Sequence, residues 1–103
     1  MEMEESIFSI MSFVGESRDN VNKALDAAEK EDFKKADELI KESCKSICKA
    51  HDVQTTFIQK EAGNDKVPFS VLFVHAQDHL MTAISERETA LRLINIYKKI
   101  AKK

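Results

Sequence analysis

The hydrophobic positions along the chain fall into three segments with helical periodicity. In the first, about residues 4–30, the apolar stripe is Ile7, Met11, Val14, Val21, Leu25 and Ala28. In the second, about residues 32–62, the stripe is Phe33, Ala36, Ile40, Cys44, Ile47, His51, Gln54, Ile58 and Glu61. Side chains spaced in this way lie on one face of an α-helix. Two amphipathic helices are therefore predicted, and the second becomes polar toward its end.

The third segment, about residues 68–100, carries two stripes. The stripe expected to contact the other helices is Leu72, Ala76, Leu80, Ala83, Leu91, Ile94 and Tyr97. The other, at the 3.5-residue spacing of coiled coils, is Val71, Val74, Asp78, Met81 and Ser85. A monomeric three-helix bundle needs only one buried stripe per helix. The second stripe therefore predicts that this helix also meets copies of itself in a homo-oligomer.

Two short breaks separate the segments and set their direction. The first is Glu31-Asp32, with Asp32 a suitable N-cap for the second helix. The second break is Gly63-Asn64-Asp65-Lys66, with Gly63 as a C-terminal cap and Pro68 near the start of the third helix. Because a connection as short as the first forces a hairpin, consecutive helices are expected to run antiparallel.

Length and composition support one helical domain. The 103 residues leave room for a single core, so residues 1–103 are expected to form one domain. Two glycines and one proline are too few for many short strands. The expected fold class is all-α, with an antiparallel three-helix bundle as the protomer.

Charge and cysteine content exclude several classes of function. The formal net charge of −2 argues against nucleic-acid binding. No apolar run approaches the roughly 20 residues of a membrane span, and the acidic start of the chain is unlike a signal peptide. A cytoplasmic location is therefore expected. Cys44 and Cys48 have no third sulfur to complete a zinc site, so they are interpreted as reduced thiols in the core.

One stretch concentrates polar side chains in an apolar run: Val74-His75-Ala76-Gln77-Asp78-His79-Leu80-Met81. On a helix, His75 and His79 share one face, and Asp78 neighbours His75. If the turn between the second and third helices is centred near residues 65–66, Gln54 lies level with Gln77. Two polar interruptions far apart in the sequence then form one site in space.

Four interpretations of this cluster compete. In the first, the histidines are partly buried and only form hydrogen bonds with Gln54, Gln77 or backbone groups, and His51, Gln54 and Glu61 only satisfy one another. A zinc site is disfavoured, because Ala76 follows the first histidine where a zincin helix carries glutamate. In a third interpretation, His75 is a general acid–base oriented by Asp78. In the fourth, His75 is a nucleophile that accepts a phosphoryl group, with Gln77, His79 and Gln54 as supporting groups.

The second stripe also suggests a metal. A cyclic trimer would bring three Asp78 carboxylates to one axis, where they would repel one another. They would then be protonated or share a cation, and carboxylate oxygens suit Mg²⁺ or a similar hard ion.

Three motifs resemble enzyme IIA of the lactose/cellobiose/chitobiose class of the bacterial sugar phosphotransferase system. They are Ala50-His51-Asp52-Val53-Gln54-Thr55, Ile58-Gln59-Lys60-Glu61-Ala62-Gly63 and Val74-His75-Ala76-Gln77-Asp78-His79-Leu80-Met81-Thr82-Ala83. The resemblance extends over nearly the whole chain. It implies a homotrimer of three-helix protomers, a nine-helix bundle, with His75 phosphorylated on Nε2 and Asp78 binding a metal ion on the threefold axis.

The resemblance also implies the partners. The histidine phosphocarrier protein would donate the phosphate, and a cysteine of the IIB component would accept it. The membrane is then involved only through the IIC channel, and the sugars are of the β-diglucoside or β-galactoside type. The sequence does not specify the sugar or the cation. The alternative function is a helical adaptor or signalling module in which the His–Asp cluster is a structural metal site.

Overall fold

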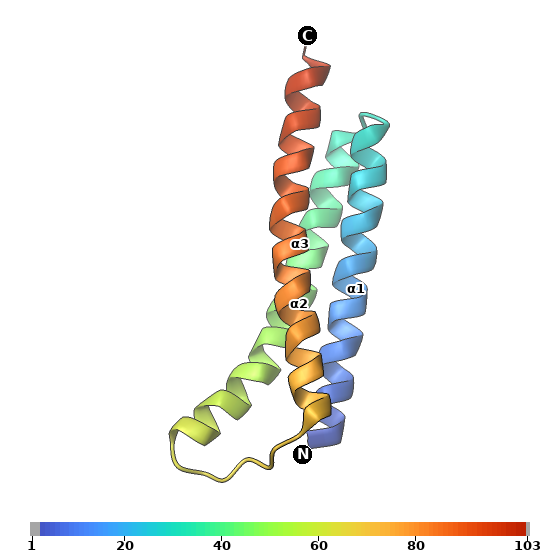
Figure 1. Ribbon diagram of the computed structural model, residues 1–103. Helices are drawn as coiled ribbons and strands as arrows, with labels where there is room; N and C mark the ends of the chain where they lie inside the picture. Colours follow the sequence, from blue (N-terminus) through green and yellow to red (C-terminus); the bar gives the residue numbers. More distant parts are fainter. Residues whose placement is uncertain (1–2, 103) are drawn as a thin grey trace.

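The computed structural model describes residues 3–102, and three long helices make up most of this range (Figure 1). Helix α1 spans Met3–Glu29, α2 spans Phe33–Ala62 and α3 spans Val71–Ala101. The chain runs up α1, down α2 and up α3 (Figure 1). The resulting bundle is elongated and measures 57 × 20 × 18 Å. The prediction of an all-helical, antiparallel three-helix protomer is confirmed. No helix in the described range is both long and apolar enough to cross a membrane.

The tight connection between α1 and α2 depends on two residues. Glu31 adopts the left-handed conformation with φ 63°, which reverses the chain within a few residues. Asp32 then caps α2, because its side chain accepts a hydrogen bond from the Lys35 N–H at 3.3 Å. The predicted break and its N-cap are both confirmed.

The second connection differs from the prediction at its far end. Gly63 caps α2 as expected, and its N–H donates to the Gln59 carbonyl at 2.9 Å. Helix α3, however, begins at Val71, three residues after Pro68. Ser70 is the cap, because its hydroxyl accepts a hydrogen bond from the Phe73 N–H at 3.1 Å. A serine oxygen satisfies a free N–H of the first turn, whereas Val67, the residue before the proline, has no such oxygen.

The inward face of α3 lies one position away from the predicted stripe at two points. Leu72 and Leu91 are 64% and 37% exposed, and Phe73 and Ala90 are buried in their place. The central positions, including Leu80, are buried as predicted. Apolar residues on neighbouring positions made either register plausible at these points, and packing selected the one that is continuous with the centre.

The same correction applies to α2. Ser43, Ala50 and Phe57 are buried, while Ile58 is 51% exposed. Cys44 is only partly buried and Cys48 is exposed, so the interpretation of both as core thiols is wrong. The predicted stripe departs by one position at Cys44, His51 and Ile58, where the buried residues are Ser43, Ala50 and Phe57, and it agrees with the buried face again at Ile47 and Gln54.

The core consists of two apolar clusters separated by a polar layer. One cluster, near the start of α3, includes Val14, Ile47 and Leu80, and the other, near its end, includes Ile40 and Ile94. Ser17, Ser43, Ser46 and the partly buried Arg87 occupy the intervening positions. Apolar packing is therefore interrupted midway along the bundle.

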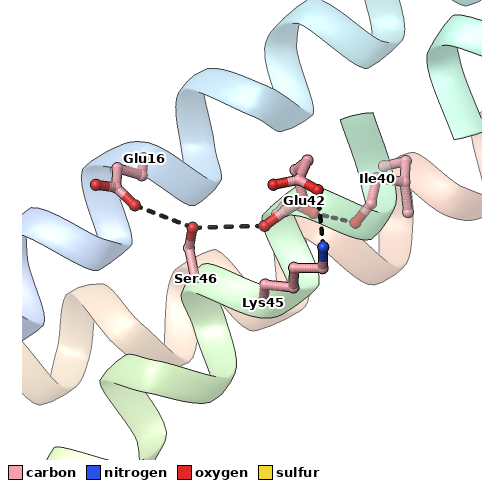
Figure 2. A network of polar contacts seen from close by, with 6 residues as sticks. Glu16, Ile40, Glu42, Lys45 and Ser46 are labelled. Carbon is pink, nitrogen blue, oxygen red and sulfur yellow. Dashed lines mark hydrogen bonds and ion pairs between the residues drawn. The ribbon is translucent and has the colours of Figure 1, made fainter. Parts of the chain in front are cut away.

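Hydrogen bonds satisfy part of this layer (Figure 2). The Ser43 hydroxyl donates to the Ile40 carbonyl at 2.7 Å, and the Ser46 hydroxyl lies 3.2 Å from Glu16 Oε1 and 3.4 Å from the Glu42 carbonyl. The Ser46–Glu16 contact links α2 to α1 across the middle of the bundle. Lys45 forms an ion pair with Glu42 at 3.1 Å on the outer surface.

The second stripe of α3 is exposed. Val71, Val74 and Met81 are 71%, 42% and 47% exposed, and Asp78 and Ser85 are exposed with them. Exposed apolar side chains in a row are typical of a surface that meets another protein. The protomer alone leaves this row uncovered.

Candidate functional site

Two imidazole rings form the centre of the candidate site. His75 and His79 lie one turn apart on α3, and their Nε2 atoms are 3.0 Å apart. The ring centroids are separated by 4.5 Å and the planes meet at 77°. His75 is exposed, while His79 is partly buried. The helical spacing of the two residues is sufficient to produce this contact, as the sequence predicted.

An arginine absent from the sequence-based site lies behind this pair. Nη1 of Arg18, on α1, is 3.5 Å from Nδ1 of His79. The same guanidinium forms an ion pair with Glu86 on α3, with Nε–Oε1 at 2.9 Å and Nη2–Oε2 at 3.1 Å. Helices α1 and α3 run in the same direction, so residues about 65 positions apart in the sequence lie at the same height. From the sequence, this relationship is the signal that could have placed Arg18 beside His79.

The polar end of α2 contributes one side chain to the site. Gln54 is 6% exposed and donates a hydrogen bond from Nε2 to Oε1 of Gln77 at 3.0 Å, so the predicted proximity of these residues is confirmed. His51 is exposed and contacts Thr55 at 3.3 Å on its own helix. Glu61 is also exposed. The structure therefore brings Gln54 into contact with Gln77, and Glu61 lines a cavity that Val74 and Gln77 also line, whereas the hydrogen-bond contact of His51 is with Thr55.

Asp78 does not by itself provide a metal site. It is exposed on the row of α3 that the protomer leaves uncovered. Within residues 3–102, no three histidine, cysteine or acidic side chains are grouped so as to hold a metal ion. Hard cations take six or more oxygen ligands, of which one carboxylate supplies at most two. The carboxylate chemistry fits Mg²⁺, but copies of the chain and water would have to complete the coordination.

The arrangement can accept a chemical group on an exposed imidazole nitrogen at the protein surface. An exposed imidazole nitrogen is a competent nucleophile near neutral pH, and the ring of His79 lies beside that of His75. Gln77 lies two positions from His75, on another side of α3, where it is bonded to Gln54. The nearby cavity of about 190 Å³ is lined in part by Phe57, Phe73 and Gln77, and His75 is not among its lining residues. An exposed ring outside this cavity suits a protein that brings its own reactive group to the surface.

Comparison with known proteins identifies the class and then the family. Residues 5–98 match the family model described as PTS system, Lactose/Cellobiose specific IIA subunit, and the chain belongs to this family. It is 42% identical over 95 residues to the PTS system lactose-specific EIIA component of Lactococcus lactis subsp. lactis, covering 92% of this chain and 90% of that protein. It is also 39% identical over 99 residues to the lichenan-specific phosphotransferase enzyme IIA component of Bacillus subtilis (strain 168), covering 96% and 90%.

Solved structures agree in fold. The PTS cellobiose-specific enzyme IIA from Bacillus anthracis superposes with a TM-score of 0.93 at 38% identity, covering 100% of this chain and 95% of that one. A IIA(chitobiose) chain in a complex with HPr, from the N,N'-diacetylchitobiose branch of the Escherichia coli phosphotransferase system, gives 0.86 at 35% identity and 98% coverage of both chains. The resemblance inferred from the histidine motif is thereby confirmed at the level of the family.

Proposed function

We propose that this protein is a phosphoryl carrier that accepts a phosphoryl group on Nε2 of His75. The donor is the histidine phosphocarrier protein, and the acceptor is a cysteine of the cognate IIB component. The observation that carries the proposal is the exposed ring of His75, with its Nε2 held 3.0 Å from Nε2 of His79. The complex of a related IIA chain with HPr supports the choice of donor.

The transfer balances without an added acid or base. The lone pair on Nε2 of His75 forms the new N–P bond as the N–P bond of the donor histidine breaks, and the electron pair of the broken bond returns to the donor nitrogen. If the second ring nitrogen of each histidine keeps its hydrogen, the positive charge moves with the phosphoryl group from one ring to the other. His79 and Gln77 are the side chains proposed to orient the ring or the phosphoryl oxygens, with Gln54 holding Gln77.

The assembly in this proposal is a homotrimer built on α3. The exposed row containing Val71, Val74 and Met81 supplies the apolar contact, and Asp78 lies between those residues. Three copies of Asp78 would hold one Mg²⁺ on the threefold axis. The ion would offset repulsion among the three carboxylates, and it takes no part in the transfer chemistry.

The cargo of the pathway is proposed to be a β-diglucoside or β-galactoside type of sugar. The names of the relatives refer to lactose, lichenan, cellobiose and chitobiose. In the proposed relay this chain touches partner proteins and no sugar, so the choice among sugars belongs to the membrane and IIB partners.

Phosphorylation of the purified protein tests this function. Incubation with enzyme I, the histidine phosphocarrier protein and phosphoenolpyruvate should add one acid-labile phosphate per chain. His75→Ala should abolish labelling. His51→Ala is the matched control. His51 is an exposed histidine whose ring contacts Thr55 on its own helix, so this variant should be labelled as the wild type is. Absence of label in the wild type would instead favour the helical adaptor.

A further inference from the structure

The contact between the two rings permits two assignments of hydrogen. With the Nε2 atoms of His75 and His79 3.0 Å apart, one nitrogen donates a hydrogen and the other offers a lone pair. Nε2 of His75 is ready to attack phosphorus only if it is the one with the lone pair. The ring pair alone does not distinguish these assignments.

Arg18 distinguishes them. Its Nη1 lies 3.5 Å from Nδ1 of His79, at the long end of hydrogen-bond distances. A guanidinium carries only N–H donors and has no acceptor. A hydrogen on Nδ1 of His79 would therefore point at another N–H group. His79 avoids this clash by keeping its lone pair on Nδ1 and its hydrogen on Nε2.

This hydrogen faces His75. Nε2 of His75 accepts it and so bears a lone pair, while the hydrogen of that ring lies on Nδ1. In the attack, the Nε2–H of His79 must leave this lone pair and donate to a phosphoryl oxygen, so that the lone pair can form the N–P bond. We propose that Arg18 is a positioning residue, which fixes the tautomers of both rings and thereby selects Nε2 of His75 as the atom that takes the phosphoryl group. The inference rests on the proposed relay for its functional consequence, although the tautomers themselves can be measured without it.

Glu86 holds Arg18 in place for this role. Both carboxylate oxygens of Glu86 are engaged, one by Nε at 2.9 Å and one by Nη2 at 3.1 Å. Two parallel contacts fix the plane of a guanidinium far better than one. The remaining nitrogen, Nη1, is left facing the ring of His79. The side chains of Arg18 and Glu86 are 39% and 44% exposed, so their mutual contact serves geometry more than stability.

Nuclear magnetic resonance of the whole protein, labelled with ¹⁵N-histidine, tests the assignment. Long-range ¹H–¹⁵N correlations distinguish the two neutral tautomers of each ring. In the wild type, His75 should carry its hydrogen on Nδ1 and His79 on Nε2. In Arg18→Met, both rings should become mixtures of tautomers, and the rate of phosphorylation should fall roughly 10- to 100-fold, by analogy with groups that orient metal-binding histidines.

Lys23→Met is the matched control. Lys23 is also a cation on α1, paired with Asp19 at 3.0 Å and 60% exposed, and its loss should change neither the tautomers nor the rate. Arg18→Met with wild-type tautomers overturns the inference, as does a wild type with the hydrogen on Nε2 of His75. If Arg18→Met does not fold, the wild-type spectrum still decides. Wild-type protein that takes no phosphate overturns the relay instead, whatever the tautomers are.

Discussion

Nε2 of Gln54 donates a hydrogen bond to Oε1 of Gln77 at 3.0 Å, and this contact joins the polar end of α2 to the histidine segment of α3. Figure 1 shows that the last part of α2 slants away from the other two helices. The rings of Phe57 and Phe73, 5.1 Å apart between centroids, pack nearby. The amide pair and the ring pair thus connect the last part of α2 to α3.

Gln54→Ala should destabilise the protein by roughly 1 to 2 kcal/mol. The change removes a hydrogen bond worth about 1 kcal/mol and leaves space at a buried position. Urea unfolding measures the loss. Gln59→Ala is the control, because Gln59 is exposed on the same helix, and its effect should stay within about 0.5 kcal/mol. Equal effects of the two substitutions would mean that the buried amide pair contributes nothing.

Leu80→Ala and Leu72→Ala should differ widely, although both were predicted to face the core. Leu80 is fully buried and Leu72 is 64% exposed. The first substitution should cost about 2 to 5 kcal/mol through lost contacts and a cavity, and the second should cost less than about 0.5 kcal/mol. Chemical denaturation of both variants checks the register of α3. A large loss for Leu72→Ala would place that residue in an interface.

If the proposed trimer forms around a metal ion, Asp78→Leu should remove that ion and leave the chains assembled. Asp78 is exposed on the protomer but would be buried on the proposed axis, and exchanging a buried charge for an apolar side chain of similar size is often neutral, or stabilising by about 1 to 4 kcal/mol. Elemental analysis gives the metal content and sedimentation gives the oligomeric state. Asp52→Leu, at an exposed aspartate on α2, should retain the metal. Unchanged metal in Asp78→Leu would refute the axial role of Asp78, and wild-type monomers at micromolar concentration would refute the trimer.

Cys44→Ser should make Cys48 react faster with iodoacetamide at mildly alkaline pH. Neighbouring Cys44 raises the pKa of the Cys48 thiol, and desolvation and Asp52 add to the rise. Removing Cys44 lowers the pKa of Cys48 toward its usual value, so a larger fraction is the reactive thiolate at a given pH. The pH dependence of alkylation measures the change. Asp52→Asn should shift the profile in the same direction but less, because Asp52 has the weaker influence.

The sequence predicted the helices well because strong periodicity and caps coincide. Asp32 and Gly63 mark the first and last turns of α2 in the sequence, and each caps the helix in the structure. The start of α3 was harder to locate, since Pro68 and Ser70 are both suitable near a helix N-terminus. Only the hydrogen bond from the Phe73 N–H to Ser70 decides between them.

The candidate site was predictable to the extent that it lies on one helix. The spacing of His75 and His79 fixes their contact, and antiparallel pairing correctly placed Gln54 beside Gln77. Arg18 was missed because a single arginine on the polar side of an amphipathic helix resembles any solvated cation. Its position beside His79 depends on the relative height of α1 and α3, which side-chain packing sets across a separation of 61 residues.

The division of the core by Ser17, Ser43 and Ser46 has a mechanical consequence. The buried serines leave the two apolar clusters with few apolar contacts to each other, so we expect the end that carries His75 and the end that carries the α1–α2 connection to open with different free energies. Amide hydrogen exchange should divide along the same line, with distinct opening free energies for the two halves.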